Sequence, residues 1–142
     1  GVTMSTSGNL NLRSGDALVA DIADLAATAT EINRAADVSA RVQELTATAA
    51  VTAGVQSLEL NHASTIIAAT IASTLNHPGL FIVKDTSATG TAAHTVTITT
   101  GTWNGTNKII TLNALNEAIA VYFDSAGNGT ILVNVGSVAL SG

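Results

Sequence analysis

The chain has 142 residues, the length of one ordinary domain, and a net charge of −5 with only five lysine and arginine residues. This charge balance excludes a basic patch for nucleic acid or an anionic membrane, and the absence of cysteine excludes disulfides and thiolate metal sites. Aromatic residues make up 3% of the chain and alanine is abundant, so each buried side chain removes little area from water. We therefore expect a thin core within one chain, with further burial between chains.

The first part of the chain, up to residue 61, is rich in alanine, threonine and acids. Residues 1–15 hold three glycines among polar residues, which predicts an extended N-terminal arm or one short strand around "NLNLR". Residues 16–61 are predicted to form an Ala/Thr-rich segment of short helices, because apolar residues recur at helical spacing from Leu18 and Asp16 can cap the first turn. The spacing slips by two residues near Asp37, which excludes one unbroken coiled coil.

Two details divide this segment into short units. The sequence "TATE", Thr28 to Glu31, matches a capping box, and Leu25 and Leu45 open similar Ala/Thr runs twenty residues apart. Seams of small residues rarely sustain a monomeric helical bundle, and an exposed apolar seam needs a partner. We therefore predict that the segment docks on a neighbouring chain. The predicted interface residues are Leu18, Ile22, Leu25, Ile32, Val42 and Leu45.

From residue 62 to 142 the chain changes to threonine, isoleucine, valine and glycine in strand-like alternation. The turn sequences "HPG", "SATG", "WNGTN" and "SAGNG" separate the candidate strands. In "ILVNV", alternation places Ile131, Val133 and Val135 on one face. The pattern predicts an antiparallel β-sandwich or barrel-like module, and an α+β fold class for the chain. The candidate strands are residues 65–69, 80–84, 95–99, 109–112, 118–123 and 130–135.

Few residues are candidates for chemistry. None of the histidines, His62, His77 and His94, lies three or four residues from another, so no spacing supports a metal site. Glu117 and Asp124 bracket a predicted strand and fall on opposite faces, which favours capping and solvation over acid–base catalysis. A small hydrolase that uses His94 with either carboxylate is the enzymatic alternative, but no G-x-S-x-G elbow is present. We expect no catalytic, cofactor or metal site.

Three other patterns are interpreted as turns or carry no signal. "DSAGNG", residues 124–129, starts like a calcium loop but lacks the ligands at its third and twelfth positions, so it predicts a hairpin turn. Asn104 and Asn128 each head an Asn-Gly-Thr sequon, which we interpret as an Asn-Gly turn. The sequence has no secretory signal pattern and no apolar run of 18 residues, so we expect neither secretion nor a membrane span.

The stretch "TATEINRAADVSARVQELTATAA" resembles segments in structural proteins of tailed bacteriophages. Fibre-like and head-associated proteins of these phages carry units of the form T-A-T-A-A-E-L-N; residues 28–33 are close to this unit and residues 45–50 open a second one. The part from "HPGLFIVKDTSATGTAAHTVTI" to "YFDSAGNGTILVNVGSVAL" resembles the β-module that follows such units in small virion proteins. The resemblance implies a virion component, a homotrimer and no enzymatic activity.

A short chain with one helical segment and one β-module fits a capsid decoration (cement) protein. Such a protein lies on the capsid surface and bridges neighbouring subunits of the major capsid protein, its expected partner, through many shallow contacts. The alternative is a short head or tail fibre protein that binds a host receptor or glycan through loops near Trp103 and Tyr122. Both functions need no cofactor, nucleic acid or membrane.

Overall fold

The computed structural model describes residues 3–4, 10–11, 41–72, 74, 77 and 79–142. The chain divides into two units, Gly1–Val38 and Ser39–Gly142. In the first unit, strands β1 (Thr3–Met4) and β2 (Leu10–Asn11) form an antiparallel pair. The part of the predicted helical segment before residue 41 lies outside the described residues. So do four of the predicted interface residues, Leu18, Ile22, Leu25 and Ile32.

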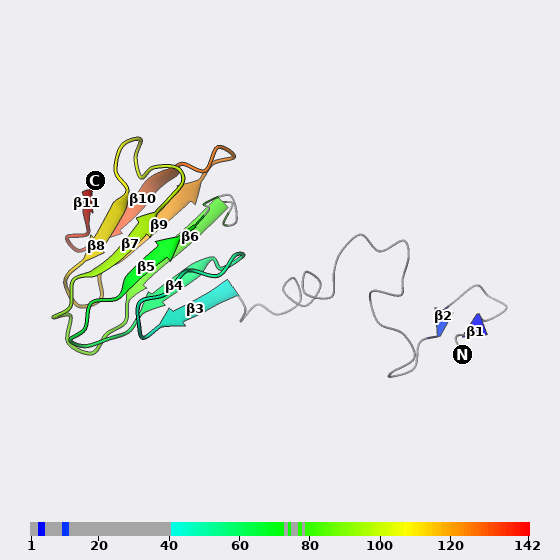
Figure 1. The fold of residues 1–142 in the computed structure, drawn as a ribbon, viewed down its shortest axis with the longest axis horizontal. Coiled ribbons are helices and arrows are strands. Elements are labelled where there is room, and N and C mark those ends of the chain that lie inside the picture. The colour runs from blue at the N-terminus through cyan, green and yellow to red at the C-terminus, as the bar shows by residue number, and fades with distance from the viewer. Residues whose placement is uncertain (1–2, 5–9, 12–40, 73, 75–76, 78) are drawn as a thin grey trace. The chain divides into compact units, whose positions relative to one another are not determined.

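The described residues of the second unit form two mixed β-sheets (Figure 1). The five-stranded sheet has the order β10-β9-β6-β4-β3 and the four-stranded sheet has the order β11-β8-β7-β5. The first sheet contains β3 (Val42–Leu45), β4 (Ser57–Leu60), β6 (Gly79–Asp85), β9 (Ala118–Phe123) and β10 (Gly129–Val135). The second contains β5 (Ala68–Ile71), β7 (His94–Ile98), β8 (Ile109–Leu112) and β11 (Ala139–Ser141).

From β3 to β7 the chain crosses repeatedly between the two sheets, and each strand pairs parallel with the strand that preceded it in the same sheet. In the first sheet β3 pairs with β4 and β4 with β6, while in the second sheet β5 pairs with β7. Ala50 adds a parallel bridge to Thr70 at the outer edge of β5. The later strands β8 to β11 pair antiparallel with their neighbours. The prediction of a purely antiparallel module was therefore wrong for the first half of the module.

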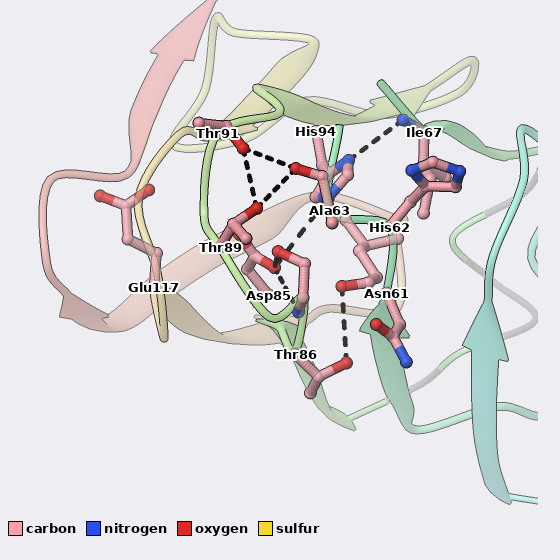
Figure 2. Close-up of polar contacts among 12 residues, drawn as sticks. Asn61, His62, Ala63, Ile67, Asp85, Thr86, Thr89, Thr91, His94 and Glu117 are labelled. Carbon is pink, nitrogen blue, oxygen red and sulfur yellow. Dashed lines mark hydrogen bonds and ion pairs between the residues drawn. The ribbon is translucent and has the colours of Figure 1, made fainter. Parts of the chain in front are cut away.

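Threonine side chains form hydrogen bonds between consecutive turns of this winding. Where the chain leaves the five-stranded sheet, Thr89 and Thr91 donate to the carbonyl oxygen of Ala63 at 2.7 and 2.6 Å (Figure 2). These bonds satisfy a corner carbonyl that no strand can reach, which gives the abundant threonine a structural role. The same arrangement recurs where the chain leaves the four-stranded sheet, with Thr99 and Thr100 donating to the carbonyl oxygen of Ala72.

The inner faces of the two sheets share one apolar core. Phe123 lies at its centre, and the centroid of its ring is 5.6 Å from that of Phe81 and 5.4 Å from that of Trp103. All three aromatic side chains are at most 1% exposed. The expectation of a thin core was therefore wrong, because three of the four aromatic residues gather at one place.

Residues 41–61 belong to the predicted short-helix segment, but they contain β3 and β4 and no α-helix. Val42 and Leu45 are three residues apart, which fits a helix face, but in the strand their side chains point to opposite sides of the sheet. Parallel pairing with β4 over four residues gives β3 hydrogen bonds along one edge, and its other edge ends the sheet. Tertiary pairing thus outweighs the weak helical preference of this sequence.

Candidate functional site

Asp85 and His94 form a buried polar cluster where β6 ends and β7 begins (Figure 2). Asp85 Oδ1 accepts hydrogen bonds from the N–H and hydroxyl of Ser87 at 2.8 and 2.5 Å, and it lies 4.0 Å from His94 Nε2. His94 Nδ1 accepts the backbone N–H of Ile67 at 3.1 Å. Nδ1 is therefore the acceptor nitrogen of the ring, and Nε2 lies on the side of Asp85.

This cluster is not arranged to activate a nucleophile. In a nucleophilic triad the imidazole lies between the hydroxyl and the carboxylate. In this protein the carboxylate of Asp85 lies in the middle, and the Ser87 hydroxyl donates to it instead of to His94. All three residues are at most 2% exposed. The hydrogen bond from Ile67 ties the start of β7 to the backbone before β5, while Asp85 and His94 lie beside each other without a hydrogen bond.

Glu117 is a second buried carboxylate, 2% exposed, just before β9. Its Oε2 accepts the N–H groups of Asn113 and Ala114 at 2.6 and 3.1 Å, and its Oε1 accepts the N–H and hydroxyl of Ser137 at 2.6 and 2.7 Å. Desolvation disfavours the charged form, but the hydrogen bonds from Ser137, Asn113 and Ala114 together outweigh it and lower the pKa of Glu117. The carboxylate therefore caps two loops and has no free oxygen for catalysis.

Asp124 begins the hairpin turn between β9 and β10 and is exposed. Its Oδ1 accepts the N–H groups of Ala126 and Asn128, each at 2.9 Å. The bond from the Asn128 N–H is the main cause of a lowered Asp124 pKa. The predicted hairpin turn is confirmed, and Gly127 supplies the positive φ of 84° that the turn requires.

The other two histidines make separate local contacts. His62 Nδ1 accepts the backbone N–H groups of Ser64 and Thr65 at 3.2 and 2.9 Å. His77 is 3% exposed, and its Nδ1 hydrogen-bonds the Val55 carbonyl oxygen at 2.6 Å. Burial lowers the pKa of His77, and the bond to Val55 partly offsets this effect. Across the described ranges, no group of three histidine, aspartate or glutamate side chains is placed to hold a metal ion.

A different kind of surface covers the side of the five-stranded sheet that faces away from the core; we call it the outer face. Cross-strand register aligns its side chains in three rows, each of which runs from the β3 side towards β10. The middle row crosses all five strands and contains Val42, Ser57, Ile82, Ala120 and Val133. The charged row contains Glu44, Glu59, Lys84, Ala118 and Val135. The bulky row crosses only the last three strands and contains Leu80, Tyr122 and Thr130.

The outer face gathers most of the exposed apolar side chains of the second unit. Among the described residues, nine large apolar side chains are well exposed, and six of these lie on the outer face. Their exposed fractions run from 38% for Ile82 to 52% for Val133 and Val135. Exposed apolar side chains that lie together on one face of a sheet are typical of surfaces that bind another protein. The six side chains are Val42, Leu80, Ile82, Tyr122, Val133 and Val135.

A β-bulge in β10 places two of these valines on the outer face. The register of β10 against β9 shifts between Ile131 and Val133. The inserted residue reverses the alternation, so Ile131 packs partly against the core while Val133 and Val135 face outwards. The prediction that these three residues share a face was therefore wrong. The sequence "ILVNV" contains no residue pattern that predicts the bulge. The outer face was therefore not predicted from the sequence.

Two of the predicted interface residues lie in the described part of the chain. Val42 is 49% exposed and belongs to the outer face, whereas Leu45 is 7% exposed and packs in the core. The predicted pair of loop aromatics does not form a binding platform. Trp103 is fully buried and its Nε1 donates to the carbonyl oxygen of Lys108 at 3.0 Å, while Tyr122 stands on the outer face.

Comparisons of the chain with models of protein families, with curated proteins and with solved structures found no match. Within the described ranges, no helix is long and apolar enough to cross a membrane. The geometry of the second unit therefore carries the argument about function, and its outer face is the candidate site.

Proposed function

We propose that the chain is a structural virion protein of a tailed bacteriophage, which binds the outer capsid surface and stabilises the shell by bridging major capsid subunits. The outer face is the observation that carries this proposal, because an apolar sheet surface is suited to binding protein rather than to chemistry. The resemblance of the Ala/Thr-rich stretch and the β-module to phage structural proteins supplies the virion setting.

The size of the outer face fits a role that depends on repetition. Five strands spaced ~4.8 Å apart, with up to seven residues rising ~3.3 Å each, cover on the order of 500 Å². A standard protein interface buries ~800 Å² on each partner, so one such contact is weak by itself. Many copies arranged on one particle add their contacts by avidity, which suits a protein that reinforces a shell.

The polar clusters support a role without catalysis. The carboxylates of Asp85, Glu117 and Asp124 accept hydrogen bonds from the chain's own backbone and serine hydroxyl groups. In this proposal the chain assembles as a homotrimer, and short helices before residue 41 dock on capsid subunits through the predicted interface residues Leu18, Ile22, Leu25 and Ile32. The alternative of a receptor- or glycan-binding fibre has less support, because Trp103 is buried in the core.

The test compares phage particles with and without the chain. Mass spectrometry of purified particles should find the chain at a fixed copy number, and particles that lack it should release DNA at a lower temperature or on dilution. Adding back the purified chain should restore resistance. Particles without the chain, or particles whose stability does not change when the chain is removed, would contradict the proposal.

Two variants test whether the outer face is needed. Ile82→Glu places a charge in the middle row, whereas Ile66→Glu changes an equally apolar side chain, 54% exposed, in the loop between β4 and β5. We expect Ile66→Glu to restore particle stability and Ile82→Glu to fail. Equal restoration by both variants would exclude the outer face from this role.

A further inference from the structure

We propose that the outer face binds the outer face of a second copy of the chain, around a two-fold axis that runs along the middle row. This inference rests on the proposed function in one respect, because it takes the outer face as a docking surface and names the partner of that surface. Three observations carry it: the placement of charge, the alternation of bulky and small side chains, and the position of the acids.

The charge on the outer face is placed so that a like-charged copy can approach. Each chain carries a net charge of −5, so a contact between two copies is favoured where it brings no carboxylates together. The outer-face side chains of β9 and β10 are uncharged. The charged side chains of this face lie on the other strands, in one row: Glu44 on β3, Glu59 on β4 and Lys84 on β6. The neutral region is therefore the part that another copy can cover.

The shape of the outer face is complementary to itself. Along β9 the outward side chains are Ala118, Ala120 and Tyr122, so one end of the strand is small and the other is bulky. A two-fold axis along the middle row brings Tyr122 of one copy over Ala118 of the other, and the reverse. The same rotation places Leu80 over the methylene stem of Lys84. Sheets that pack face to face interdigitate large and small side chains in this way.

The same axis leaves the acids in water. The middle row packs against itself, so that Ile82 and Val133 each meet the same residue of the second copy. Glu44 and Glu59 lie beyond this row on β3 and β4, which begin in the middle row. Within the described residues, no strand residue of the second copy lies opposite these two acids, so this axis does not bury them beneath a strand.

A face-to-face arrangement with its axis along the strands and centred on β6 is unfavourable. An axis along the strands and centred on β6 would lay β10 over β3 and β9 over β4. Val135 would then cover Glu44, and Ala118 would cover Glu59. Two carboxylates per chain would lose water without gaining a partner, which is costly. The axis along the middle row is therefore the arrangement that we infer.

The first test is the mass of the pure full chain by sedimentation equilibrium, without particles. We expect an even-numbered assembly: a dimer of the 14.2 kDa chain, or a hexamer in which this two-fold contact joins two homotrimers of the proposed function. A monomer or a trimer at every concentration would overturn the inference. Ile66→Glu is the control, because it changes an exposed apolar residue away from the outer face and should leave the mass unchanged.

The second test is a swap of Tyr122 and Ala118, which this axis brings into contact. Tyr122→Ala and Ala118→Tyr should each raise the dimer dissociation constant about tenfold or more. The double variant should have a dissociation constant within about threefold of the wild-type value, because the Tyr–Ala contact is restored. A double variant as weak as either single variant would overturn this axis. Leu80→Lys with Lys84→Leu on β6 is a second swap, should the first set fail to fold by circular dichroism.

The failure of this inference and the failure of the proposed function are distinguishable. A chain that forms even-numbered assemblies but is absent from particles would contradict the capsid role alone. A chain that stabilises particles but stays monomeric in solution would contradict the self-association alone, and the outer face would then contact the capsid protein directly.

Discussion

At the scale of single residues, the buried carboxylate of Glu117 organises two loops that are distant in the sequence. It accepts hydrogen bonds from residues three and four positions before it and from Ser137, twenty positions after it. Gly136 completes this site, because a Cβ atom there would lie 2.7 Å from the Glu117 Cγ atom. The sequence marks Glu117 as a cap but gives no sign of Ser137, since that contact depends on the return of the chain after β10.

Glu117→Gln should lower the free energy of unfolding by about 1–3 kcal/mol at pH 7, because an amide NH₂ would replace one acceptor and face a buried donor. Urea denaturation measures this loss. The folded pKa of Glu117 is below its ordinary value of 4.5, so its stabilisation is complete above that pH and is lost as the pH falls through the folded pKa. The difference between variant and wild type should therefore shrink at acid pH.

The control for this prediction is Asp124→Asn, which makes the same chemical change at an exposed hairpin turn. It should change stability little, because water can satisfy the N–H groups that Asp124 accepts. An equal loss for both variants, or a loss at Glu117 that does not depend on pH, would contradict the role given to the buried carboxylate.

At the scale of elements, strands flanked by turn residues were predictable, including β6 and β7 of the parallel winding, whereas β3 and β4 at the start of that winding were not. β8 and β9 were predicted with their observed bounds, and β6, β7 and β10 to within one residue at each end, because alternation and turn residues flank them. β3 and β4 were predicted as helix. Ser57 of β4 pairs with Val42 and Ile82, fifteen and twenty-five residues away, and no local pattern encodes such pairing.

The start of β10 depends on close contact with the core. A Cβ atom on Gly129 would lie 2.7 Å from the Trp103 ring and 2.9 Å from Val121. Gly129→Ala should therefore lower the free energy of unfolding by about 1–3 kcal/mol, as overpacking does in other cores. Thermal unfolding followed by Trp103 fluorescence measures the effect. Thr130→Ala, at the exposed neighbour, should stay within about 0.5 kcal/mol, and a fully stable Gly129→Ala chain would contradict the packing described.

At the scale of the whole molecule, composition did not predict how the core is built. Few aromatic residues suggested that one chain could not build a thick core, yet Phe81, Trp103 and Phe123 build one together. The apolar surface left for a partner lies on the outer face instead. Its rows depend on the register of five strands and on the bulge in β10, and neither can be read from residue order.

The central claim is that a protein partner covers the outer face, and hydroxyl-radical footprinting of the full chain tests it most directly. Tyr122 and Leu80 on the outer face are 51% and 50% exposed in the single chain, and the loop residues Ile66 and Leu115 are 54% and 49% exposed. The four side chains are therefore about equally exposed in the single chain. Their intrinsic reactivities with hydroxyl radicals differ, and the rates measured for the same side chains in the denatured chain correct for this difference.

At concentrations where the chain assembles, or on phage particles, we expect protection of Tyr122 and Leu80 while Ile66 and Leu115 keep the reactivity that their exposure gives. Dilution below the dissociation constant should remove the protection in solution. Equal reactivity of all four side chains under both conditions would contradict the claim.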